Sequence, residues 1–203
     1  MPSVFLLKPG CIRRDEAGRI LDARSSVTLI ISGAHKIIVD SGSAGEEEII
    51  KRALADLHIS PGEVDSLVNT HSHPDHCGNN HLFFRAKHLA VRDGDVIAPA
   101  VWIMATPGHS MDSISVVVGA DPPGNGGRDG KGNPRIGCGT VVIAGDAVPT
   151  RGNFQKMVPP ALHVDRALAE ASLKKIVALA DFIVPGHDFS FFVDKGADIS
   201  SRG

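Results

Sequence analysis

The chain has 203 residues and lacks an excess of charge of either sign, since 21 Lys and Arg residues face 23 Asp and Glu residues. Proteins that hold nucleic acid by charge usually show a basic excess or a basic stripe. The chain also lacks any apolar run near the roughly 18 residues of a membrane span. These absences disfavour a polyanion-binding protein and predict no membrane-spanning segment.

Cysteine is scarce as well. The three Cys residues, at positions 11, 77 and 138, are odd in number, far apart and without a CxxC pair. This usage is typical of reduced thiols in a cytoplasmic protein and disfavours a disulfide framework. The apolar run Val4–Leu7 is too short for a signal-peptide core and predicts a first strand. With 42% apolar residues, the composition predicts one domain over residues 1–203.

The apolar pattern indicates strands with two helices placed among them. A capping box of Ser43 and Glu46 precedes apolar residues at helical spacing, Ile50, Leu54 and Leu57. A second helix is predicted over residues 165–180. Strands are predicted at residues 27–31, 36–40, 66–69, 88–91, 100–104, 114–118, 140–144 and 182–184. This layout predicts an α/β fold with helices outside paired sheets.

Residues 121–139 have a different composition, with seven Gly and three Pro among nineteen residues and almost no apolar side chain. A segment of this kind cannot bury enough surface to order itself. It predicts a flexible connection between two strands.

The strongest chemical signal is His71-Ser72-His73-Pro74-Asp75-His76, four potential metal ligands in six residues. Three imidazoles and a carboxylate crowded together are hard to satisfy without a cation. Imidazole nitrogen and carboxylate oxygen are ligands of Zn²⁺ and also suit Fe and Mn. The cluster follows a predicted strand, which places it on a loop at the edge of a sheet.

Three later segments repeat one design, in which an apolar strand runs into a turn that carries a ligand-type residue directly after a glycine. The residues are His109, Asp146 and His187. Glycine lets the backbone turn sharply and approach a cluster closely. Five further histidines, at positions 35, 58, 81, 88 and 163, lack such a context and are interpreted as surface residues or as residues satisfied by local hydrogen bonds. Cys77 is interpreted as a buried, inert thiol.

These motifs together resemble the metallo-β-lactamase superfamily, whose signature is HxHxDH followed by separate His, Asp and His residues. The resemblance spans Asp40 to His187 and implies an αββα sandwich with metals at one edge of the sheets. It implies a first metal held by His71, His73 and His109, a second held by Asp75, His76 and His187, and a bridge between them through Asp146. It also implies that Asp40 orients a ligand histidine, as metal-bound imidazole normally requires.

The implied chemistry is hydrolysis by hydroxide held between two divalent metals about 3.5–4 Å apart. Asp75 is expected to accept a hydrogen bond from the hydroxide and orient it. Zn is the expected metal, with Fe and Mn as alternatives. The expected substrate is a small ester, thioester or lactone, because charge and length favour a small molecule over a polymer.

Differences between this sequence and other branches of the superfamily narrow the expected reaction and substrate. Its β-lactamases lack the aspartate that Asp146 matches. Glyoxalase II needs a longer region than the sixteen residues after His187, and β-CASP nucleases insert a domain where only 41 positions separate Asp146 from His187. Acyl-homoserine lactonases use a pocket tyrosine, and this chain has no Tyr.

Two alternatives stay open. The runs 105–109, 115–118 and 184–187 resemble the metallo-β-lactamase domain-containing protein 1 group, which has been associated with RNA cleavage; RNA is possible but not favoured without a basic surface. The run Gly145-Asp146-Ala147, followed by Arg151-Gly152 and Phe154-Gln155, resembles iron-dependent sulfur dioxygenases, which hold one iron. A homodimer is compatible with all of these readings.

Overall fold

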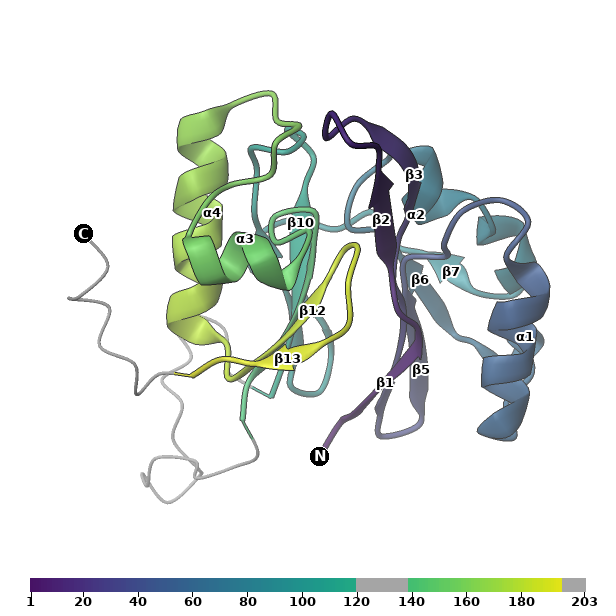
Figure 1. The fold of residues 1–203 in the computed structure, drawn as a ribbon. Coiled ribbons are helices and arrows are strands. Elements are labelled where there is room, and N and C mark those ends of the chain that lie inside the picture. The colour runs from purple at the N-terminus through teal and green to yellow at the C-terminus, as the bar shows by residue number, and fades with distance from the viewer. Residues whose placement is uncertain (120–138, 195–203) are drawn as a thin grey trace, which may run out of the picture.

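Two β-sheets face each other in the computed structural model, which describes residues 1–119 and 139–194. Figure 1 shows helix α1 outside one sheet and helix α4 outside the other, which is the expected αββα sandwich. In the first sheet the strand order is β1 (Ser3–Lys8), β4 (Val27–Ser32), β5 (His35–Val39), β6 (Ser66–Val68) and β7 (Lys87–His88).

The second sheet brings the carboxyl ends of three ligand-bearing strands to one edge. The strand order is β13 (Phe191–Phe192), β12 (Phe182–Pro185), β11 (Val141–Gly145), β10 (Ile114–Val118), β9 (Val101–Ala105) and β8 (Val96–Ala98). Strand β10 is antiparallel to both β9 and β11, and β11 is parallel to β12. Strands β9, β11 and β12 therefore run in one direction, so the loops that follow them meet at the same edge.

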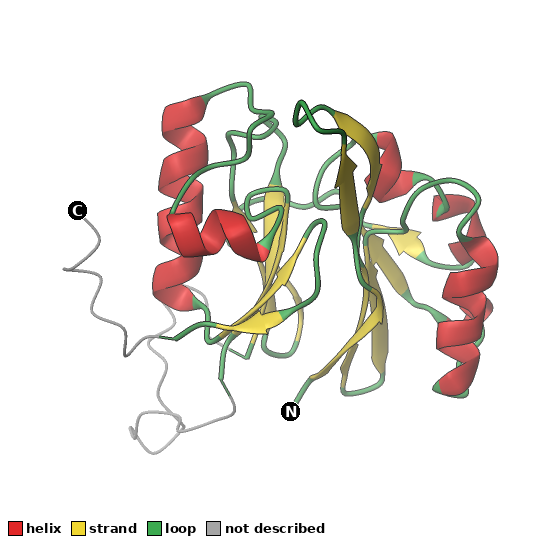
Figure 2. Cartoon of the chain, in the orientation of Figure 1, coloured by secondary structure: helices red, strands yellow, loops and turns green. Residues whose placement is uncertain are grey.

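Helices cover the outer faces of the sandwich, as the red ribbons in Figure 2 show. Their bounds are α1 (Glu47–Asp56), α2 (Pro74–Cys77), α3 (Arg151–Lys156) and α4 (Arg166–Leu179), with 3₁₀ turns η1 (Pro61–Glu63) and η2 (Asn80–Phe83). Helix α4 buries Leu173 and Ile176, and the side chain of Asp165 caps its first turn by accepting a hydrogen bond from the amide of Leu168 at 2.9 Å. No helix among the described residues is both long and apolar enough to cross a bilayer.

The space between the sheets is filled by aliphatic side chains from both. Ile30 and Val39 of the first sheet pack with Ile103, Val116 and Ile143 of the second, and all five are essentially buried. Burying such side chains stabilises the fold by about 1.5–3 kcal/mol each. At the site edge the layers are also joined directly, because the amide of Ile114 donates to the carbonyl of Thr70 at 2.8 Å.

A hairpin absent from the sequence prediction rises at the site edge. Its strands, β2 (Cys11–Arg14) and β3 (Ile20–Arg24), form a separate two-stranded sheet. Figure 1 shows this hairpin (dark purple) where the two halves of the molecule meet. Its strands are short and mostly exposed, with charged and apolar residues mixed, so they carry little of the apolar alternation that identifies a half-buried strand.

Two sequence predictions need correction, and a third concerns residues that the structure does not describe. Ser43 does not cap α1, which begins at Glu47; instead the Ser43 amide donates to the buried Glu46 carboxylate at 2.8 Å, and Lys8 lies 3.0 Å from the same carboxylate. This ion pair with Lys8, distant in sequence, holds Glu46 in place. The strand predicted at 88–91 shrinks to Lys87–His88. The predicted flexible segment 121–139 lies, apart from Gly139, outside the described residues.

Candidate metal centre

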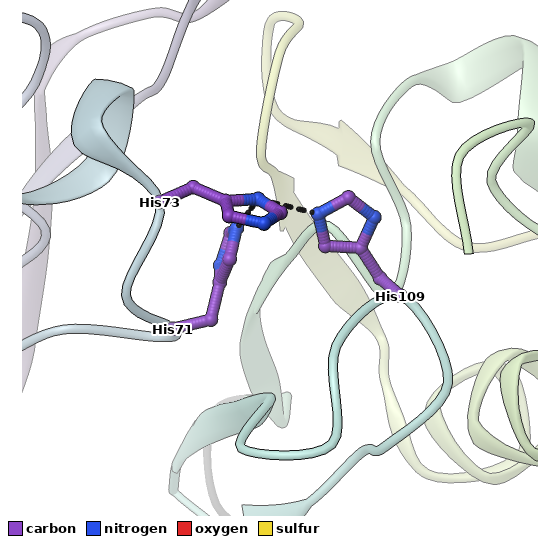
Figure 3. Close-up of side chains that lie close together, drawn as sticks. All are labelled: His71, His73 and His109. Carbon is purple, nitrogen blue, oxygen red and sulfur yellow. Dashed lines mark hydrogen bonds between the residues drawn. The ribbon is translucent and has the colours of Figure 1, made fainter. Parts of the chain in front are cut away.

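Three histidines from two loops converge at the site edge (Figure 3). Nε2 of His71 and Nε2 of His109 each lie 3.0 Å from Nδ1 of His73. Zn–N bonds are about 2.0–2.1 Å long, so nitrogens this close together can share one ion. His71 and His73 follow β6 of the first sheet, whereas His109 follows β9 of the second. The group therefore spans both layers.

A second group lies beside the first and consists of Asp75, His76 and His187. One ligand atom from each lies within 4.8 Å of the others. Nε2 of His187 is 3.5 Å from Oδ2 of Asp75. His76 and His187 are buried, whereas Asp75 is partly exposed. This group therefore brings two imidazole nitrogens and one carboxylate oxygen close enough together to hold a metal ion.

The Asp146 carboxylate lies between the two groups. Its Oδ2 is 3.3 Å from Nε2 of His109 in the first group. Its Oδ1 is 3.1 Å from Nε2 of His187 and 3.4 Å from Nε2 of His76 in the second. All seven residues singled out in the sequence are therefore brought together, with Asp146 placed to touch both sides.

In His76, His109 and His187, Nε2 faces the cluster. The other ring nitrogen, Nδ1, lies next to a hydrogen-bond acceptor in each case. Nδ1 of His109 lies 2.7 Å from the carbonyl oxygen of Leu162, and Nδ1 of His187 lies 3.0 Å from that of Arg24. Nδ1 of His76 lies 2.7 Å from Oδ2 of Asp40. An acceptor at Nδ1 keeps the proton there and leaves Nε2 free for a metal.

Asp40 is held in a constrained position to serve His76. It follows β5, is 2% exposed and has φ of 58°, a left-handed value that is uncommon for residues other than glycine. Its carboxylate accepts hydrogen bonds from the amide of Thr70 at 2.7 Å and from the Thr70 hydroxyl at 2.8 Å. Asp40 is thus placed as the sequence implied, and its partner is His76.

The donor set fits a cation. Nε2 of His76 and Oδ1 of Asp146 are buried and have no hydrogen-bond partner among the described residues. Buried polar atoms nearly always have a hydrogen-bond partner, so two facing ligand atoms without one indicate that they bind another group. A divalent cation between them would satisfy both. The site therefore suits the metal that its residues imply.

Charges within the cluster shift its protonation. Burial opposes charge on His76, but the Asp40 and Asp146 carboxylates outweigh burial and hold the pKa of His76 well above its usual value. Burial also opposes charge on His187, yet the hydrogen bond with Asp146 raises its pKa. Despite burial, these two histidines hold the pKa of Asp146 well below its usual value. Burial, together with the charge on His76, lowers the pKa of His71 to about 3.

Two glycines in the ligand-bearing turns are required by close approach. A Cβ on Gly186 would lie 2.1 Å from Oδ1 of Asp146. A Cβ on Gly145 would lie 2.6 Å from Oγ1 of Thr70, and Gly145 also has φ of 52°. A side chain at Gly186 would push the Asp146 carboxylate out of place, and one at Gly145 would displace Thr70.

A pocket of about 420 Å³ opens onto the cluster. Its floor contains His73, Asp75, His109, Asp146 and His187. One wall is the β2–β3 hairpin, through Ile12, Arg14, Ile20 and Ala23. The opposite wall is mainly apolar and contains Pro149, Val158, Pro159, Pro160 and Leu162. The pocket thus combines a metal-binding floor with walls that suit an apolar group.

The other residues considered in the sequence lie away from the pocket. His35, His58, His81 and His88 are exposed, and Nδ1 of the partly buried His163 lies 2.6 Å from the carbonyl of Pro160. Cys77 was expected to be buried but is only partly so, because it ends the short helix α2, where its thiol donates to the carbonyl of His73 at 3.2 Å. Sequence reasoning missed Arg24 and Leu162, which act through backbone carbonyls that every residue possesses.

Comparison with known proteins agrees with this site. The family model described as the metallo-β-lactamase superfamily matches residues 22–102. A probable metallo-hydrolase of Methanocaldococcus jannaschii is 36% identical over 203 residues, covering 95% of this chain and 90% of that protein. Human metallo-β-lactamase domain-containing protein 1 is 33% identical over 239 residues, covering 96% of this chain and 84% of that protein.

Solved structures share the fold at lower sequence identity. A probable metal-dependent hydrolase from Staphylococcus aureus superposes with a TM-score of 0.70 at 14% identity, covering 93% of this chain and 91% of that one. An N-acyl homoserine lactone hydrolase superposes with a TM-score of 0.66 at 19% identity, covering 91% and 92%. With a full-length relative at 36% identity and the ligand residues assembled at the sheet edge, the chain belongs to the metallo-β-lactamase superfamily.

Proposed function

We propose that the protein is a binuclear metal-dependent hydrolase of small esters, thioesters or lactones. The position of Asp146 carries the proposal, because its carboxylate contacts ligand nitrogens of both groups: His109 in the first, and His76 and His187 in the second. We assign His71, His73 and His109 to one metal and Asp75, His76 and His187 to the other. Zn is the proposed metal, and the N/O donor set also accepts Fe or Mn.

Two such metals supply a hydroxide near neutral pH and polarise the substrate oxygen. The chain's own residues then position the reactants. Asp75 is partly exposed at the pocket floor, and its carboxylate is placed to accept a hydrogen bond from the attacking water and orient it. No serine or cysteine is among the described residues that line the pocket, so no hydroxyl or thiol nucleophile is offered there.

The pocket supports a small substrate. A volume of about 420 Å³ accommodates a metabolite-sized ligand, and the walls are mainly apolar. The homoserine lactone hydrolase of the same fold was solved with N-hexanoyl-L-homoserine at its catalytic metal centre. That ligand is the product of ring opening, a carboxylate derived from an ester, which is the reaction class proposed for this chain.

The test combines metal counting with hydrolysis. We expect purified protein to contain two divalent metals per chain and to hydrolyse activated esters or lactones, with all activity lost on chelation. Asp146→Ala should lose the bridge and most of the second metal, whereas His88→Ala, at an exposed histidine far from the pocket, should retain both. One iron per chain with oxygen consumption on a persulfide, or RNA cleavage faster than any ester tested, would contradict the proposal.

A further inference from the structure

Apart from the cluster itself, two polar side chains line the pocket, Arg14 and Asn153. Asn153 is occupied within its own loop. Its Nδ2 donates to the carbonyls of Val158 and Pro159 at 3.2 and 3.1 Å, and its Oδ1 accepts from the Thr150 hydroxyl at 2.7 Å. Arg14 is therefore the polar group that remains to contact a ligand.

The register of the β2–β3 hairpin explains why Arg14 reaches the pocket. Ile12 pairs with Ala23 and Arg14 pairs with Ile20, and these four residues all line the pocket. Alternate residues of a strand face opposite sides, so Arg13, which pairs with Asp22, faces away. The inner face of the hairpin is thus apolar near its base and carries one cation near its turn.

The guanidinium of Arg14 has N–H donors that remain available for a ligand. Its Nη1 donates to the carbonyl of Gly18 at 2.9 Å, and a guanidinium has five N–H donors. Within the described part of the chain, no carboxylate is ion-paired with Arg14, and the adjacent Asp15 is paired with Arg19 at 2.7 Å. The remaining donors can bind a carboxylate or phosphate in the two-pronged geometry that arginine favours.

The hairpin also sets the separation between Arg14 and the metal-binding floor. The carbonyl of Arg24 holds Nδ1 of His187, and Arg24 pairs with Cys11 at the base of the hairpin. Arg14 lies three residues farther along the strand, a rise of about 10 Å. The backbone of Arg14 therefore lies roughly that far along the hairpin from the residue that holds His187, with the Ile12–Ala23 pair in between.

We propose that Arg14 is a specificity-determining residue that binds an anionic group, carboxylate or phosphate, at the far end of an apolar segment of the substrate. This proposal rests on the proposed hydrolase function and narrows its substrates to anionic, amphipathic esters, thioesters or lactones. The apolar segment lies between the walls, and Arg14 selects for charge at the pocket mouth.

Hydrolysis of paired substrates provides the first test. The substrates are para-nitrophenyl monoesters of α,ω-dicarboxylic acids of increasing length, each compared with the analogue whose terminal carboxylate is replaced by a carboxamide. In zinc-loaded protein we expect the carboxylate to lower KM on the order of tenfold at the best length. Arg14→Gln should abolish that preference, so that the carboxylate and the carboxamide of each pair have the same KM. Arg14→Lys should keep part of it, and Arg13→Gln, on the opposite face of the strand, should keep all of it.

Binding provides a second test that does not depend on turnover. Calorimetry with zinc-loaded protein would compare an α,ω-dicarboxylate with the monocarboxylate of equal length, and then with the analogue carrying a terminal phosphate. Tighter binding of the doubly charged ligands, lost in Arg14→Gln and kept in Arg13→Gln, would support the proposal. Whichever terminal group binds more tightly, carboxylate or phosphate, identifies the anion that Arg14 selects. Equal affinities in the native protein, or equal effects of the two variants, would overturn it. Failure of every ester to react would refute the hydrolase function instead.

Discussion

Oδ2 of Asp40 lies 2.7 Å from Nδ1 of His76, with both side chains almost completely buried. The same carboxylate also accepts two hydrogen bonds from Thr70, the residue that precedes the ligand cluster. Asp40 therefore fixes both the ring of His76 and the loop from which the first ligands project. This relationship leads to the first prediction.

Asp40→Ala should weaken the second metal site more than the first. Without the carboxylate, Nδ1 of His76 loses its acceptor, and partners of this kind typically contribute 10–100-fold to metal affinity, an order-of-magnitude expectation. Zinc competition with a chromophoric chelator would measure the two affinities separately. Asp40→Asn, which keeps the shape and one acceptor oxygen, should lie between native and Ala. Equal loss at both sites would point to general unfolding.

Asp75→Asn should separate metal binding from turnover. The amide is a weaker ligand, so part of the second metal should remain, whereas the negative acceptor for the attacking water is gone. We expect kcat to fall on the order of 10²–10⁴-fold, as for other positioned acid–base groups. Steady-state kinetics at measured metal content would check this. A variant with full metal and native kcat would remove Asp75 from the mechanism.

Metal binding should release protons at neutral pH. The pKa values of His76 and His187 are raised in the metal-free site, which favours their protonated forms, and a metal that binds at Nε2 must displace that proton. A raised pKa also means that this charge pairing stabilises the metal-free fold at low pH and is lost as pH rises through the folded-state pKa. Zinc titrations in buffers of different ionisation enthalpy would count the protons. No buffer dependence near pH 7 would contradict the raised pKa values.

The Lys8–Glu46 ion pair should be costly to break. Both side chains are buried, 8% and 2% exposed, at a separation of 3.0 Å. Removing one partner of a buried pair leaves an unpaired charge, at a cost of about 3–5 kcal/mol. We expect Glu46→Gln to lower the free energy of unfolding by roughly that amount, measured by urea denaturation. The control is Glu48→Gln, which removes the exposed partner of Lys51 and should leave stability almost unchanged.

Much of the fold and the metal cluster could be predicted from local pattern. Strand β10 has the predicted bounds, and helix α4 differs from its prediction only by its capping residues Asp165 and Ala180. The reason is physical: helix α4 buries one apolar face, β10 is a short apolar run buried on both faces, and both patterns can be seen in adjacent residues. The ligand residues were visible because their side-chain chemistry is unusual at such density.

The parts that escaped prediction depend on contacts distant in sequence. The carbonyl of Arg24 serves His187, 163 positions later, and any residue could supply that oxygen. The capping box at Ser43 is only half formed, because the Ser43 hydroxyl donates to the distant Ala23 carbonyl at 3.4 Å while the Ser43 amide still donates to Glu46. The β2–β3 hairpin is held at its base by Gly10, whose missing Cβ would lie 2.3 Å from the Gly186 carbonyl oxygen. None of these partners can be paired from local sequence alone.

The ligand residues are divided between the two layers of the sandwich. The residues of the 71–76 loop belong to the first sheet, whereas His109, Asp146 and His187 follow strands of the second. A cation held by residues from both layers is a cross-link between the halves of the molecule, as a disulfide would be. The cysteines of the chain provide no such link among the described residues, where Cys11 and Cys77 are free. Metal binding and the packing of the two sheets are therefore coupled. The protein should resist unfolding and proteolysis in proportion to its metal content.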